Sequence, residues 1–151
     1  MRVSAKADYA IRAMVELAAA ETGPSKAERL AQAQEIPLKF LENIMTELRQ
    51  AGLVRSQRGA EGGYWLARPA EEITLAQVIR AVDGPLANVR GRRPEEVEYG
   101  GVAAPLRDVW VAVRASLRAV LESVTLADVA RRELPDAVAG LTADADAWLS
   151  H

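Results

Sequence analysis

The chain has 151 residues, with no cysteine and a single histidine, which is its last residue. Without cysteine it can form no disulfide, no thiol nucleophile and no thiolate ligands for zinc or an iron–sulfur cluster. One histidine also argues against a metal site built from imidazole ligands. No nucleophile–base pair or carboxylate pair can be assembled from the remaining residues. We therefore expect no metal, no cofactor and no enzymatic activity.

Aromatic residues make up only 5% of the chain, and the formal net charge is −2. A protein that binds nucleic acid through its overall charge would be basic. Because this chain is slightly acidic overall, only a local basic patch could bind nucleic acid. No apolar run approaches the roughly 20 residues needed to cross a membrane. Asp8, Arg12 and Glu16 interrupt the apolar N-terminal segment, which is typical of an amphipathic helix rather than a secretory signal. We expect a cytoplasmic protein with no membrane partner.

Half of the residues are apolar, and their spacing predicts a mainly helical fold. Ser4 is a suitable first cap, Ser25 with Glu28 forms a capping-box pattern, and Thr74 with Gln77 forms another. The expected helices in the first part of the chain cover residues 4–20, 26–34, 38–51 and 74–82. Asp83-Gly84-Pro85 then stops the last of them.

Two short apolar segments, residues 53–58 and 64–67, predict a β-hairpin between the third and fourth helices. Three glycines at its tip permit positive φ angles and a tight connection. The order helix, helix, turn, helix, hairpin, helix is typical of a winged helix-turn-helix fold. We therefore expect residues 1–85 to form a mainly α DNA-binding domain with a small β-hairpin wing.

The helix over residues 38–51 has an apolar stripe on one side and polar residues on the other. In a helix-turn-helix, the N-terminal part of this helix enters the major groove, which selects Leu38, Lys39, Glu42 and Asn43 as base readers. Asn43 suits adenine, and Glu42 suits the amino group of cytosine. An ordinary amphipathic helix with a solvated polar face has the same pattern.

Arg58 stands immediately before the wing tip and suits a narrow, electronegative minor groove, while Arg55 and Arg68 suit flanking phosphates. Residues 37–68 contain five Lys or Arg against three Asp or Glu, so the patch carries only +2. Two alternatives remain open: a glycine-rich turn with solvated charges, and a winged helix that has lost DNA binding and acts as a protein-interaction module.

Residues 86–104 predict an irregular, partly mobile loop, and residues 105–134 predict dimerisation helices. Apolar residues in the long helix follow the 4, 3, 4, 3, 4 spacing of a heptad seam. The seam residues are Leu106, Trp110, Val113, Leu117, Val120 and Val124. Each buried aliphatic side chain stabilises by about 1.5–3 kcal/mol, which favours a homodimer over packing against the first helix. The tail, residues 135–151, is expected to dock weakly or to be disordered.

Three motifs lie in one register: Ala51-Gly52-Leu53-Val54-Arg55-Ser56, Arg58-Gly59-x-x-Gly62-Gly63-Tyr64 and Val78-Ile79-x-Ala81-Val82-Asp83-Gly84-Pro85. Through them the chain resembles the Rrf2 family of bacterial winged-helix transcription regulators, closely over residues 1–85 and more loosely as far as residue 130. The resemblance implies a homodimer that represses from a palindromic operator in double-stranded DNA, with recognition helices in major grooves and wings in minor grooves.

The resemblance also extends the set of expected DNA contacts. With the neighbouring basic residues, these are Lys6, Lys26, Leu38, Lys39, Phe40, Glu42, Asn43, Arg49, Arg55, Arg58, Gly59, Gly62, Gly63 and Tyr64. Many relatives hold an iron–sulfur cluster with three cysteines after the Asp83-Gly84-Pro85 motif, but residues 88–105 of this chain contain none. We therefore expect a small-molecule or protein effector, sensed through residues 86–104, instead of a cluster.

Overall fold

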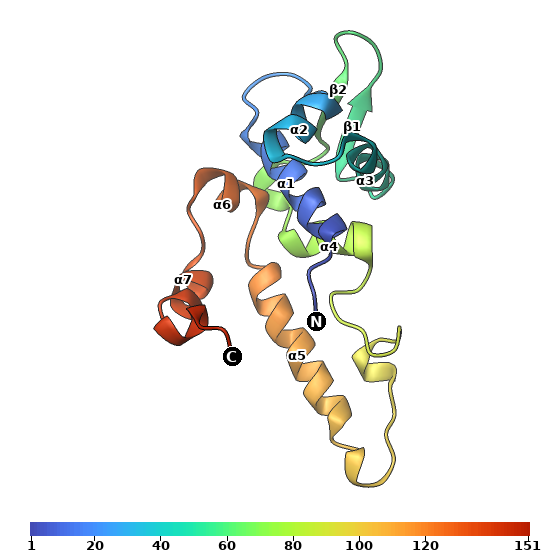
Figure 1. Cartoon of the computed structure of the whole chain (residues 1–151), viewed down its shortest axis with the longest axis vertical. Coiled ribbons are helices and arrows are strands. Elements are labelled where there is room, and N and C mark those ends of the chain that lie inside the picture. The colour runs from blue at the N-terminus through green and yellow to red at the C-terminus, as the bar shows by residue number, and fades with distance from the viewer.

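A computed structural model describes residues 1–151 and shows a mainly helical chain with one antiparallel hairpin (Figure 1). The helices are α1 (Ala5–Ala19), α2 (Ala27–Gln34), α3 (Leu38–Gln50), α4 (Leu75–Asp83), α5 (Leu106–Leu121), α6 (Leu126–Arg131) and α7 (Asp136–Thr142). The strands are β1 (Val54–Gln57) and β2 (Gly63–Leu66). Short 3-10 helices are η1 (Ala70–Glu72), η2 (Pro94–Glu96), η3 (Gly101–Ala103) and η4 (Ala145–Trp148). The predicted fold class is confirmed. None of the helices combines the length and apolar character that a membrane crossing requires.

Side chains cap the starts of three helices, and the sequence predicts those at Ser4 and Thr74. The Ser4 hydroxyl accepts a hydrogen bond from the Ala7 amide at 2.9 Å. Thr74 and Gln77 form a reciprocal capping box, and Thr125 and Asp128 form a second one. Each box satisfies two backbone donors that would otherwise lack partners at a helix start.

The capping box expected at Ser25 is wrong. Helix α2 begins at Ala27, and no side chain caps it. Ser25 instead pairs its backbone with Tyr64 of β2 through two hydrogen bonds of 2.8 Å each, and it is buried. Because this pairing fixes the backbone of Ser25 beside the hairpin, the residue is not available as a helix cap.

Helix α1 is the centre of the core, since α2, α3, α4 and α6 all pack on it. The largest side chains there are fully buried and come from most of these helices; they include Met14, Leu30, Leu41, Ile44, Met45, Leu48 and Leu126. Helix α6 thus returns the chain to the core after the excursion of α5, which extends away from it (Figure 1). Helices α1 to α4 and α6 thus share one core, with α3 and the hairpin at one end of the molecule (Figure 1).

The segment between α4 and α5 is irregular, as predicted, but it is not a loose loop. Ala87, Pro94 and Val97 are buried, and η2 lies against α5. Trp110 of α5 donates a hydrogen bond from its indole nitrogen to the Tyr99 hydroxyl at 2.9 Å. These contacts hold the segment along one side of α5.

The predicted heptad seam is only partly exposed. Helix α5 ends at Leu121, so Val124 lies outside it and is buried against α4, where its carbonyl accepts from the Leu75 amide at 3.0 Å. Leu117 faces a small apolar cavity of the same chain. Val124 is therefore wrong as a dimer residue, because the helix stops before the heptad reaches it. Leu106, Val113 and Val120 keep partly or fully exposed side chains.

The tail folds locally. Helix α7 contacts η4, and the Trp148 indole donates to the Thr142 carbonyl at 2.8 Å. Leu141, Trp148 and Leu149 are exposed. The structure therefore has a short helical unit where the sequence predicted weak docking or disorder.

Candidate nucleic-acid interface

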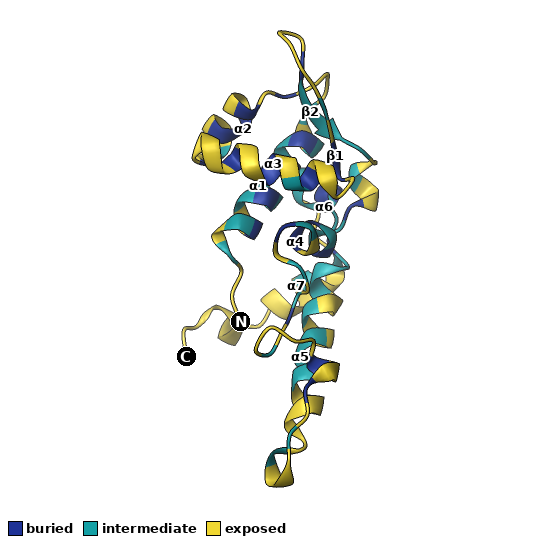
Figure 2. Cartoon of the chain, turned by 90° about the vertical axis from the view of Figure 1, so that its right-hand side faces the viewer, coloured by how far each residue is buried: buried dark blue, intermediate teal, exposed yellow.

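Helix α3 has the two faces that the sequence predicted. Leu41, Ile44, Met45 and Leu48 are each 0% exposed and anchor the helix in the core. The opposite face is exposed, as Figure 2 shows along the outer side of α3. Its polar residues are Lys39, Glu42, Asn43, Thr46, Arg49 and Gln50. A helix held on one side and solvated on the other is what major-groove recognition requires.

The start of α3 is braced by α1. The Phe40 ring meets the Tyr9 ring edge-on, with 5.5 Å between centroids, and is 38% exposed. The Arg12 guanidinium lies 4.9 Å from the centre of the Tyr9 ring and donates to the Gln34 carbonyl at 2.7 Å. Phe40 therefore helps to position α3 while keeping part of its ring free.

The wing depends on two glycines at its tip. A Cβ atom on Gly62 would lie 2.1 Å from the Gln57 carbonyl oxygen, and one on Gly63 would lie 2.6 Å from that of Ser25. Gly63 also has a φ of +148°, which disfavours other residues. These two predicted DNA-contact residues therefore have a structural role, because they let the hairpin close and dock beside α2.

Basic residues surround α3 and the wing, and their charges are not neutralised within the chain. Lys26 donates to the Gly59 carbonyl at 3.2 Å, and Arg49 donates to the Ser56 hydroxyl at 3.3 Å. No ion pair to a carboxylate involves any member of this group, which we call the wing cations: Lys26, Lys39, Arg49, Arg55, Arg58 and Arg68. Unpaired cations can neutralise phosphates without first breaking an internal salt bridge.

Lys6 differs from the wing cations. Its ammonium group is 2.8 Å from the carboxylate of Glu47, so it links α1 to α3. Both side chains are about one-third exposed. The structure thus gives this predicted DNA contact a partner inside the fold.

Ser25 is the part of the site that sequence reasoning missed. Its backbone bonds to Tyr64 fix the angle of the wing relative to α2, and its hydroxyl accepts from Arg29 at 3.2 Å. A local pattern could not reveal this pairing, because the two residues lie far apart in the sequence. The one local sign of the pairing is the glycine at position 63, where a side chain would collide with the Ser25 backbone.

The chain matches known proteins over most of its length. The Rrf2 family profile, described as an iron-dependent transcriptional regulator, matches residues 3–132. A Mycobacterium tuberculosis protein named as an HTH-type transcriptional regulator is 56% identical over 145 residues, covering 95% of this chain and 90% of that protein. The HTH-type transcriptional regulator CymR of Bacillus subtilis is 36% identical over 131 residues, covering 86% of this chain and 90% of the relative.

Solved structures agree with this match. The structure of CymR, the global cysteine regulator of B. subtilis, superposes with a TM-score of 0.74 at 35% identity, covering 87% of this chain and 98% of that one. The structure of IscR from T. potens superposes with a TM-score of 0.69 at 31% identity, covering 100% of this chain and 93% of that one. The winged helix-turn-helix architecture is therefore shared along with the sequence.

The family description names iron, but the side chains of this chain do not fit an iron–sulfur cluster. Such clusters are held by cysteine thiolates, and the chain has none. In the segment between α4 and α5, the Glu95 carboxylate is already bonded to Arg114. No group of three or more His, Cys, Asp or Glu side chains is placed to hold a metal ion.

Proposed function

The chain belongs to the Rrf2 family of transcriptional regulators, and from this we propose that it represses transcription as a homodimer bound to a palindromic DNA operator. One observation carries the proposal. The exposed face of α3 and the hairpin tip stand at the same end of the molecule (Figure 2), and the wing cations belong to α3, to the hairpin or to the residues next to it. A basic surface of this kind suits the phosphate backbone of DNA.

In the proposed complex, the N-terminal half of α3 lies in the major groove. Lys39 and Asn43 are exposed there, and Asn43 can pair with adenine through two hydrogen bonds. Glu42 repels phosphates, so it contributes to sequence selection and not to overall affinity. Arg58, at the exposed tip of the wing, enters the adjacent minor groove.

The homodimer is supported by the unusual exposure of α5. This helix has 16 residues and none of them is buried. Leu106 is 39% exposed and Val109 is 48% exposed, so an aliphatic side of α5 faces solvent. We propose that this side of α5 packs against α5 of a second copy. Dimers with this motif place their recognition helices about 34 Å apart, one turn of DNA.

Replacing Arg58 by alanine tests the DNA-binding surface. The operator is first recovered by selecting genomic fragments that the purified protein binds. On that operator, Arg58→Ala should weaken binding by about tenfold or more and lower the steepness of the salt dependence by about one unit. Fluorescence anisotropy over a range of salt concentrations measures both quantities.

Arg92→Ala is the matched control, because Arg92 is exposed and lies outside α3 and the wing. It should leave operator affinity unchanged. Equal affinity of Arg58→Ala and wild type would refute the assignment of the wing. Failure to enrich any palindrome would instead favour a winged helix that binds a protein partner.

A further inference from the structure

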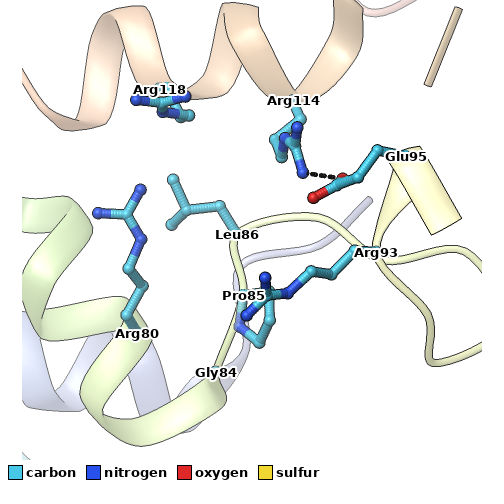
Figure 3. Close-up of a pocket in the computed structure, with 8 residues that line it drawn as sticks. All are labelled: Arg80, Gly84, Pro85, Leu86, Arg93, Glu95, Arg114 and Arg118. Carbon is cyan, nitrogen blue, oxygen red and sulfur yellow. Dashed lines mark hydrogen bonds and ion pairs between the residues drawn. The ribbon is translucent and has the colours of Figure 1, made fainter. Parts of the chain in front are cut away.

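Four arginines surround one cavity at the junction of α4 and α5. Arg80 comes from α4, Arg93 from the segment that follows it, and Arg114 and Arg118 from α5 (Figure 3). Leu86 and Glu95 also line this space, which has a volume of about 470 Å³. That volume lies within the range of about 300–1,000 Å³ usual for small-molecule sites. We call it the arginine cavity.

Positive charge is in excess around the arginine cavity. The Glu122 carboxylate accepts from both Arg80, at 2.6 Å, and Arg118, at 3.0 Å. Glu95 is bonded to Arg114. The guanidinium of Arg93 has neither a carboxylate partner nor a hydrogen bond. Four cations thus face two carboxylates, in a chain whose formal net charge is −2.

Such a constellation is better suited to a ligand than to stability. Guanidinium groups of like charge repel one another, and an anion between them removes that repulsion. Their planar, forked donors match the oxygen pairs of phosphates and carboxylates. We propose that the arginine cavity binds a small ligand that carries at least two negative charges in phosphate or carboxylate groups.

The cavity lies away from the two surfaces already assigned. Arg118 and Val109 are about two and a half helical turns apart, so they project from opposite sides of α5. The proposed dimer contact through Val109 therefore leaves the cavity open. Figure 1 shows α3 and the wing on one side of α4, and α5 on the other, so operator DNA bound at α3 does not cover the cavity either.

The position of the cavity gives the ligand a route to the recognition helix. Helix α4 packs against α3 on one side and contacts α5 on another. An anion that bridges Arg80 to Arg114 or Arg118 fixes the angle between α4 and the dimerisation helix. In the dimer, that angle sets the separation of the two recognition helices. This regulatory consequence rests on the proposed function, whereas binding of the anion does not.

Isothermal titration calorimetry of the full chain tests the binding site, with inorganic pyrophosphate as the phosphate probe and citrate as the carboxylate probe. At least one probe should bind, and the preferred one identifies the ligand chemistry. Arg93→Gln should weaken that binding by about tenfold, which corresponds to about 1.4 kcal/mol. The neighbouring Arg92→Gln changes the same charge outside the cavity and should match wild type.

Two further variants keep the result unambiguous. Arg118→Gln should also weaken binding of the probe, whereas Arg58→Ala should not, since Arg58 belongs to the wing. Thermal unfolding verifies that each variant is folded. The proposal is overturned if neither probe binds at millimolar concentration, or if Arg92→Gln and Arg93→Gln lose equal affinity. The calorimetry contains no DNA, so a failure of the probe to bind is distinct from a failure to bind the operator. Operator binding is measured separately by fluorescence anisotropy, with and without the probe.

Discussion

The part of the chain that ends at Asp83 and the part that follows it use their apolar residues differently. All but one of the 19 residues in the main buried cluster precede Gly84, and the exception is Leu126 of α6. Helix α5, in contrast, has no buried residue along its whole length. The winged helix therefore shares one core with α6, while α5 has its apolar side still available for a partner.

Besides the packing of α6 on α1, ion pairs connect these two parts. Arg80 of α4 is bonded to Glu122 just after α5, and Arg131 of α6 is bonded to Glu71 of η1. Exposed ion pairs of this kind stabilise a fold by only about 0–1 kcal/mol each. The winged helix is thus joined to α5 in part by ion pairs that a ligand or partner can change at small energetic cost. This is a suitable arrangement for regulation.

The largest expected effect comes from the core of the winged helix. Leu41 of α3 is 0% exposed, so Leu41→Ala should lower the free energy of unfolding by about 2–5 kcal/mol. Leu106→Ala, in α5, is the matched control and should cost much less in the monomer because Leu106 is 39% exposed. Urea denaturation at several protein concentrations separates the monomer contribution from that of dimerisation. Equal losses would remove the contrast between the two parts.

The two faces of α3 and the hairpin could be predicted because their sequence signals are local. The stripe of Leu41, Ile44, Met45 and Leu48 defines both faces of α3 without knowledge of any other element. Thr74 and Thr125 likewise mark helix starts, because each forms a capping box with the residue three positions later. The hairpin follows from short apolar segments around glycines. Sequence and structure agree at these elements because neighbouring residues determine their conformation.

The features that escaped prediction depend on residues distant in the chain. Ser25 resembled a helix cap, but Tyr64 took up its backbone groups. Val124 fits the heptad spacing of the sequence, but α5 ends three residues before it. The arginine cavity combines side chains from α4, α5 and the segment between them, and no single stretch of sequence shows their convergence.

A second, smaller effect is expected at the exposed side of α5. Val109→Asp places a carboxylate where two aliphatic surfaces should meet, and burial of an unpaired charge is costly. The dimer dissociation constant should rise by about tenfold to a hundredfold, or about 1.4–2.8 kcal/mol. Sedimentation velocity measures this change. Leu134→Asp, at an exposed aliphatic residue outside α5, should leave the association unchanged. An unaltered dimer in Val109→Asp would show that α5 pairs through another side.

The smallest expected effect concerns the polar joint itself. Hydrogen bonds from Arg80, and then from Arg118, lower the pKa of Glu122 below its ordinary value of 4.5. Since folding favours the carboxylate, this contribution to stability is present above that ordinary value and is lost as the pH falls through the lowered folded-state pKa. Glu122→Gln should therefore be slightly less stable than wild type at neutral pH and equally stable in acid. Urea denaturation at both pH values measures this, with Glu133→Gln, which lacks an ion pair, as the control. A deficit of the same size at both pH values would mean that Glu122 acts through packing, and the joint between the two parts would then be less electrostatic than the structure indicates.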